Sequence, residues 1–128
     1  MSYYFCKTIE APFDTVVDRT REALMSQGFG VVSEIDVTKT LKAKIGVDFR
    51  PYLILGACNP TLAHQALELE DRIGTMLPCN VVVQDLGCGR TEVAAIDPAA
   101  SLRAAENPAL LEKARAVGGM LQAAVAGV

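Results

Sequence analysis

The sequence predicts an α+β fold: a single mixed or antiparallel sheet with helices packed on it. Segments whose apolar residues alternate are interspersed with segments whose apolar residues recur every three or four positions, and these periods are typical of strands and of helices. A glycine-containing turn joins two of the alternating segments, which indicates a β-hairpin. The length of 128 residues and the hydrophobic fraction of 51% fit one core, so we expect a single domain over 1–128.

The first half of the chain is expected to begin with an alternating strand and an amphipathic helix. The helix follows Pro12, and we expect Asp14 to cap its start and Gly28 to end it. The predicted elements of this half are a strand over 3–10, a helix from 13, a strand over 29–37, a short helix over 38–45 and an interior strand over 52–57. One face of the second strand is expected to consist of Phe29, Val31, Ile35 and Val37.

The second half contains the clearest helix start, because Asn59 precedes Pro60 and this pair is typical of an N-cap followed by the first helical residue. That helix is expected to run to about Arg72, to bury Leu62, Ala66, Leu69 and Ile73, and to stop at Gly74. A hairpin over 81–96 and a final helix that starts at Asn107-Pro108 follow. The predicted order is therefore β-α-β-(short α)-β-α-β-β-α.

Charge and composition argue against nucleic acid and membrane as partners. The net charge is −3, and the basic cluster of Lys39, Lys42 and Lys44 lies between Asp36 and Asp48, which is typical of a solvated short helix. The longest stretch of low charge, 116–128, is shorter than the ~20 residues that span a bilayer. No signal-peptide pattern is present, so we expect a soluble, cytoplasmic protein whose four cysteines are reduced.

Two Cys-Asn pairs are the main candidates for a site. Cys58 is expected at the end of a buried strand, directly before the helix that Asn59 caps, where the positive end of the helix dipole would stabilise a thiolate or a bound anion. Cys79-Asn80 precedes the next strand. A helix of about 13 residues at 1.5 Å each would separate the two cysteines by roughly 20 Å, unless the segment 72–78 doubles back. Buried, structural cysteines and capping asparagines are the competing interpretation.

The same segments carry a resemblance to a known family. The chain resembles the bacterial and archaeal domain-of-unknown-function 302 family along essentially its whole length, in the blocks 28–31, 35–37, 46–52, 54–60, 77–83 and 96–98. The two Cys-Asn blocks, in order and at matching spacing, make the resemblance specific. It implies a small α+β fold similar to the TATA-binding-protein-like class, without DNA binding, and it implies no established activity, cofactor or substrate.

No catalytic or metal-binding constellation is expected. The only histidine, His64, fits no zinc pattern with the cysteines, and its i,i+4 neighbour Glu68 makes an ordinary exposed pair. Arg50 either binds an anionic ligand near Cys58 or Asn80 or pairs with Asp48 or Asp97. We therefore predict no cofactor, no metal and no catalytic residues. The candidate ligand-binding residues are Arg50, Cys58, Asn59, Cys79, Asn80 and Asp97.

The functional hypothesis is a non-enzymatic module that binds a small anionic ligand or a protein partner. The alternative is a thiol-based redox or sulfur-handling protein that uses Cys58, either alone or with Cys79. The final helix is apolar on several faces, and Gly119, Ala123 and Gly127 form a smooth ridge at i,i+4 spacing. We therefore expect a homodimer that buries this helix or the sheet edge beside it, unless a neighbouring loop covers the second face.

Overall fold

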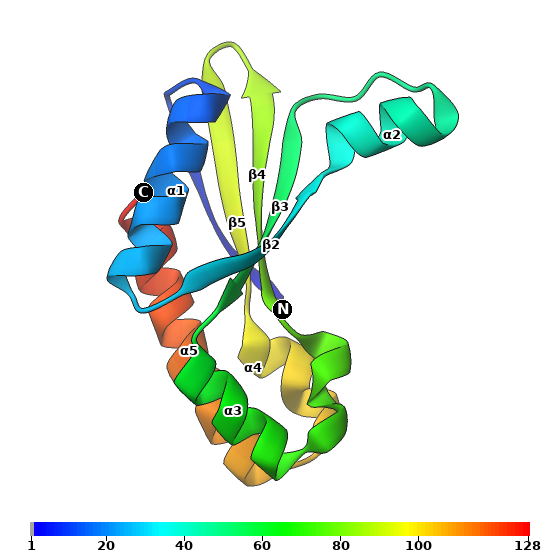
Figure 1. Cartoon of the computed structure of the whole chain (residues 1–128). Helices are drawn as coiled ribbons and strands as arrows, with labels where there is room; N and C mark the ends of the chain where they lie inside the picture. The colour runs from blue at the N-terminus through cyan, green and yellow to red at the C-terminus, as the bar shows by residue number, and fades with distance from the viewer. Residues whose placement is uncertain (1) are drawn as a thin grey trace.

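The computed structural model describes residues 2–128 and contains one antiparallel five-stranded sheet in the order β1-β5-β4-β3-β2 (Figure 1). The strands are β1 (Tyr4–Ile9), β2 (Gly30–Asp36), β3 (Tyr52–Cys58), β4 (Cys79–Gly87) and β5 (Arg90–Ile96). A tight turn at Cys88 and Gly89, both with positive φ, joins β4 to β5 as the predicted hairpin. The predicted fold class, one sheet with helices packed on it, is confirmed.

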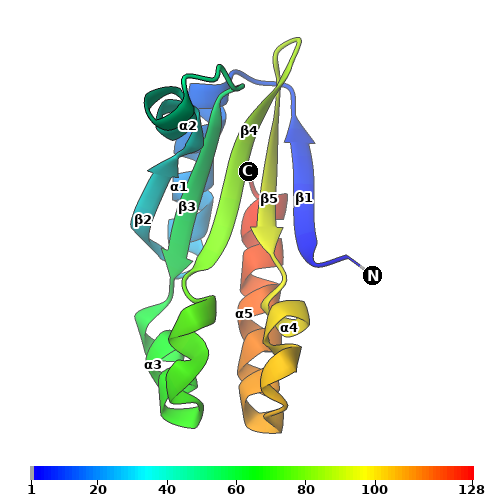
Figure 2. The same cartoon turned by 90° about the vertical axis from the view of Figure 1, so that its right-hand side faces the viewer.

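Two long helices cover one face of the sheet, and the other face lies open between shorter elements at its two ends (Figures 1 and 2). The covering helices are α1 (Phe13–Ser26) and α5 (Pro108–Ala126). The remaining helical segments are α2 (Val37–Ile45), α3 (Pro60–Leu69), the 3₁₀ segment η1 (Asp71–Met76), α4 (Pro98–Ser101) and the 3₁₀ segment η2 (Leu102–Ala105). None of the helices in residues 2–128 is both long enough and apolar enough to cross a membrane.

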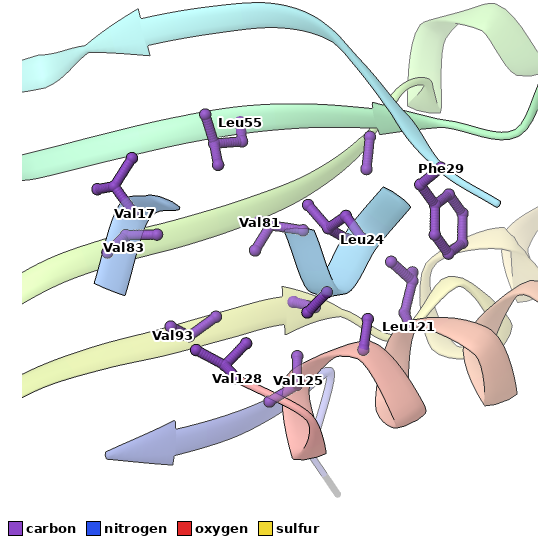
Figure 3. Close-up of a cluster of buried hydrophobic side chains, with 14 of the residues drawn as sticks. Val17, Leu24, Phe29, Leu55, Val81, Val83, Val93, Leu121, Val125 and Val128 are labelled. Carbon is purple, nitrogen blue, oxygen red and sulfur yellow. The ribbon is translucent and has the colours of Figure 1, made fainter. Parts of the chain in front are cut away.

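The main core fills the space between the sheet and the pair α1 and α5 (Figure 3). Leu24 of α1, Leu55 of β3 and Leu121 of α5 are almost wholly buried there. Thr20 and Thr91 are the buried polar residues of the described chain, and each hydroxyl donates to a backbone carbonyl. The core therefore contains no unpaired hydroxyl that would weaken it.

A second, smaller core lies beyond the end of the sheet at which β3 and β5 finish. The chain leaves β3 as α3 and comes back as η1 to start β4, and it leaves β5 as α4 and η2 and comes back as α5 (Figure 2). These two helical excursions from the sheet, α3 with η1 and α4 with η2 and the first half of α5, pack against each other. Their contact is formed by Ala66, Ile73, Leu102, Leu110 and Ala114. This helical end of the molecule is separate from the sheet core, although α5 takes part in both.

The expected inward face of β2 is wrong beyond Val31. A β-bulge between Val31 and Ser33 shifts the alternation by one residue, so Ile35 lies opposite Ile54 on the open face and is 50% exposed. Val37, expected in the strand, is the first residue of α2 because Asp36 caps that helix through the Lys39 N–H group.

Two expected helix boundaries are also wrong. Asp14 lies in the first turn of α1, and Pro12, which has no capping side chain, occupies the N-cap position. The third helix ends at Leu69 and not at Gly74, because Glu70 adopts an extended conformation and the chain continues as η1. Ala66 and Ile73 are buried as expected, whereas Leu69 is exposed. The start of α1 and the end of α3 both lie where the chain changes direction, and the position of such a change depends on tertiary packing.

Gly118 lies on the buried stripe of α5, whereas small residues on another face of this helix are exposed. A Cβ on Gly118 would lie 3.4 Å from Asp97 Oδ1 and 3.6 Å from Pro98 Cδ, so α4 packs closely on this side. Gly119 has open space around it, and Ala123 is exposed. The homodimer stays a prediction.

Gly56, in the middle of β3, is the position at which the sheet tolerates no side chain. A Cβ there would lie 2.6 Å from Pro78 Cγ and would also overlap the Ser33 side chain. The ring of Pro78 thus rests on the backbone of β3 just before β4 begins. This close approach, which needs glycine, holds the returning segment against the sheet.

We expect Gly56→Ala to lower the free energy of unfolding by about 2 kcal/mol, because the proline ring cannot move without displacing the start of β4. Gly30→Ala is the matched control, since Gly30 also lies in a strand, has no positive φ and would have no atom within 4 Å of an added methyl group. Urea denaturation of both variants measures the difference. Equal stabilities of the two variants would contradict the close approach.

Candidate functional site

A cavity of about 340 Å³ lies at the helical end of the molecule, between the ends of the strands and the two helical excursions. Its walls are almost wholly apolar. They are formed by Phe29, Val32, Ala57, Cys58, Asn59, Leu62, Ala63, Ala66, Leu67, Gly74, Leu77, Pro78, Cys79, Pro98, Leu102, Leu110, Lys113, Ala114 and Val117. Small-molecule sites typically have volumes of about 300–1,000 Å³ and apolar walls with few polar groups, so the cavity has the character of such a site.

Cys58 and Cys79 both line this cavity, and the expectation that they lie about 20 Å apart is wrong. Ala57 pairs directly with Cys79 across the antiparallel strands β3 and β4, which places Cys58 diagonally beside Cys79. The segment 70–78 doubles back through η1. This reversal is the condition under which the sequence analysis allowed the two cysteines to lie close together. Both cysteines are free thiols; Cys58 is partly buried and Cys79 is buried.

The Cys79 thiol is held in its protonated form. Burial raises its pKa from 9.0 to about 11, and the neighbouring Cys58 adds to the rise. Because the unfolded chain ionises this thiol first, the neutral thiol favours the folded state below about pH 9. That contribution is lost as the pH rises toward about 11. At neutral pH, therefore, Cys79 presents the cavity with an uncharged, weakly nucleophilic group.

Asn59 caps α3, as predicted, and also links it to the end of α1. Its Oδ1 accepts from the Leu62 N–H group at 3.1 Å, and its Nδ2 donates to the Gly28 carbonyl at 3.2 Å. Asn107 is used in the same way at the start of α5, where Oδ1 accepts from Leu110 N–H and Nδ2 donates to the carbonyl of Leu69. Each asparagine thus joins the start of one helix to the end of another, which requires both an acceptor and a donor.

Asn80 and Asp97 lie close to the cavity without lining it. Successive strand residues point to opposite faces, so Cys79 faces the core whereas Asn80, paired with Gly56, is exposed on the open face of the sheet. Asn80 is therefore a strand residue and caps no helix. Asp97 caps α4 through the Ala99 N–H group at 3.1 Å, and the next residue, Pro98, forms part of the cavity wall.

Arg50 lies at the opposite end of β3, so the expectation that it approaches Cys58 or Asn80 is wrong. At about 3.3 Å per residue, β3 separates its two ends by about 20 Å. Arg50 Nε donates to Gln84 Oε1 at 2.9 Å, and its guanidinium lies 4.4 Å from the centre of the Phe49 ring. The expected pairing with Asp48 or Asp97 is also wrong, because Asp48 pairs with Lys42. Arg50 belongs to the loop between α2 and β3.

The sequence analysis missed the walls that α3, η1 and α5 contribute, and with them Lys113. Lys113 is the one residue with a formal charge in the cavity wall. It lies three residues after Leu110 and four before Val117, at the border of the predicted apolar stripe of the final helix. A lysine at that position is a signal that helical periodicity alone could have shown.

The described residues contain no group of three or more His, Cys, Asp and Glu side chains arranged to hold a metal ion. His64 Nε2 lies 3.0 Å from Glu68 Oε1 on the exposed face of α3, which is the ordinary pair expected from their spacing.

Comparison with known proteins finds one family and a close structural relative. The sequence model of the family described as "Domain of unknown function DUF302" matches residues 5–128. The chain is also similar to a solved structure, the crystal structure of an uncharacterized conserved DUF302 protein from Bacillus stearothermophilus. The two chains share 30% sequence identity and superpose with a TM-score of 0.90 over 98% of each. No curated protein matches the chain.

The double use of Asn59 predicts that aspartate cannot replace it fully. Asn59→Ala should lower the free energy of unfolding by about 1–2 kcal/mol, because the cap and the bond to Gly28 are both lost. Asn59→Asp should keep the cap and cost about half as much, because a carboxylate cannot donate to the Gly28 carbonyl.

Asp36→Asn is the control, because the Asp36 side chain caps α2 through the Lys39 N–H group alone; this change should be nearly neutral. Chemical denaturation measures all three variants. If Asn59→Asp is as stable as the wild type, the bond to Gly28 contributes nothing.

Proposed function

This chain belongs to the DUF302 family, and we propose that it is a non-enzymatic module that binds a small, largely apolar molecule in the cavity between the strand ends, α3 and α5. The observation that carries the proposal is the cavity itself, with a volume of about 340 Å³ and an almost wholly apolar wall. Burial of apolar ligand surface contributes about 25 cal/mol per Å², so such a wall favours binding without a polar recognition network.

The chemistry of the wall supports binding over catalysis. Its polar side chains are Cys58, Asn59, Cys79 and Lys113. Asn59 already uses both ends of its amide in hydrogen bonds, and the raised pKa of Cys79 keeps that thiol neutral. Histidine and carboxylate side chains, which serve most often in general acid–base catalysis, do not contribute to this wall.

The proposal includes the cytoplasmic location and the homodimer expected from the sequence. Four free cysteines fit a reducing compartment. The exposed small residues of α5, among them Gly119 and Ala123, leave room for the close approach of a second copy.

A thiol-based function is the second candidate, and the neighbouring positions of Cys58 and Cys79 in the cavity wall favour it. In thiol–disulfide exchange, the Cys58 thiolate would attack one sulfur of a small disulfide and release the other sulfur as a thiolate. Cys79 would then displace the bound half, so that the protein gains a disulfide while the substrate gains two electrons. The raised pKa of Cys79 opposes this second step at neutral pH, and the binding function is therefore preferred.

Thiol labelling separates the two candidates. At pH 7.5 the exposed Cys6 and Cys88 should react with iodoacetamide at ordinary rates, and Cys79 should react only after unfolding, because burial protects it and keeps it protonated. The thiol function requires Cys58 to react faster than Cys6, an exposed strand cysteine that serves as the internal control. Mass spectrometry of a timed pulse measures all four, and a Cys58 slower than Cys6 removes the thiol function.

The binding function is tested with 1-octanol, an uncharged molecule with an apolar tail. In ¹H–¹⁵N spectra of the whole chain, titration should shift the amides of α3 and of the first half of α5. Ala63→Leu should abolish or weaken binding at least tenfold, because the added side chain occupies part of the cavity.

Ala116→Leu is the matched control, since Ala116 lies on the exposed side of α5 and outside the cavity wall. This variant should bind octanol like the wild type. Shifts spread over the whole surface, or equal binding by both variants, would count against the cavity as the site.

A further inference from the structure

The charge at the cavity is carried by one residue. Of the residues in the cavity wall, Lys113 alone has a formal charge, and its side chain is partly buried against apolar neighbours. The long methylene stem of a lysine can cover apolar surface while its ammonium group reaches toward water at the rim. The cavity is therefore apolar along its walls and positive at one point.

Lys113 forms no ion pair within the described chain. Residues 2–128 contain three ion pairs, formed by Arg21, Lys42 and His64, and none of them involves Lys113. On α5 the positions three and four residues away, where a helical partner would lie, hold Ala109, Leu110, Ala116 and Val117. No ion pair within residues 2–128 therefore competes with an external anion for the ammonium group.

A bound molecule that covers the cavity mouth would remove water from this ammonium. Loss of hydration from a charged group is costly unless an opposite charge replaces the water. A neutral apolar ligand would leave that cost uncompensated, whereas a ligand with a single carboxylate would form a charge-assisted hydrogen bond to the ammonium. The start of α3, which borders the same cavity through Asn59 and Leu62, carries a partial positive charge of the same sign.

We propose that the cavity takes an amphipathic monoanion, a molecule with an apolar body and one carboxylate, and that Lys113 binds the carboxylate at the rim. This inference rests on the binding function proposed above and names its ligand class. The volume of about 340 Å³ is at the lower end of small-molecule sites, so the apolar body is short, comparable to a medium-length alkyl chain. Lys113 thus has the anion-binding role that was one of the two alternatives for Arg50.

The test compares octanoate with 1-octanol, which share the alkyl chain and differ in charge, by isothermal titration calorimetry at pH 7.5. The wild type should bind octanoate about five- to tenfold more tightly than octanol. Lys113→Met keeps the unbranched stem and removes the charge, so it should weaken octanoate to about the level of octanol. Octanol should bind this variant at least as tightly as the wild type, because no ammonium group then loses its hydration. Lys113→Arg should restore most of the preference. Thermal unfolding of both variants checks that the fold is intact.

The outcomes separate this inference from the binding function. If octanol binds and Ala63→Leu prevents it, but Lys113→Met leaves the ratio of octanoate to octanol affinity unchanged, the cavity is a binding site and the anionic ligand class is wrong. A wild type that prefers octanol overturns the inference in the same way. If neither molecule binds the wild type, both the inference and the binding function fail.

Discussion

The antiparallel pairing of β3 with β4 is the constraint on which the cavity depends. Because antiparallel neighbours run in opposite directions, β4 must begin beside the point at which β3 ends, with Cys79 opposite Ala57. The intervening chain therefore leaves the sheet as α3 and returns as η1. β5 ends at the same side of the sheet, and its excursion through α4 and η2 returns as α5 (Figure 2). The cavity is the space that these two excursions enclose against the strand ends.

Two asparagines position α3 and α5 through the same pair of hydrogen bonds. Asn59 fixes the start of α3 to the end of α1, and Asn107 fixes the start of α5 to the end of α3. Each uses its carbonyl oxygen for the local cap and its amide nitrogen for the distant carbonyl, so local helix initiation and tertiary placement share one side chain. Together with the contact of Pro78 on Gly56, these bonds define the position of the cavity walls relative to the sheet.

Small residues make up much of the cavity wall. Ala63 and Ala66 of α3 and Ala114 of α5 contribute to it, and the thiol of Cys79 adds little volume. The same arrangement leaves the cavity with little charge: Cys79 remains neutral at physiological pH, and Lys113 is the one charged side chain. An apolar space with one positive point is better suited to holding an amphipathic molecule than to transferring protons or electrons.

Features that depend on residues a few positions apart could be predicted from the sequence alone. Alternating or continuous apolar segments identified the strands, the stripes of α1 and α5 identified their buried faces, and the Asn-Pro pairs identified two helix starts, because capping and helical periodicity are local. Cys58, Asn59 and Cys79 were identified as candidates on the same local grounds, and all three line the cavity. The folded structure was needed to show that Cys58 and Cys79 line one cavity, that Arg50 lies at the far end of β3, that a bulge turns Ile35 outward, and that Lys113 borders the cavity. Each of these depends on contacts between segments distant in sequence, and strand register and loop reversal carry no local signal that would reveal such contacts.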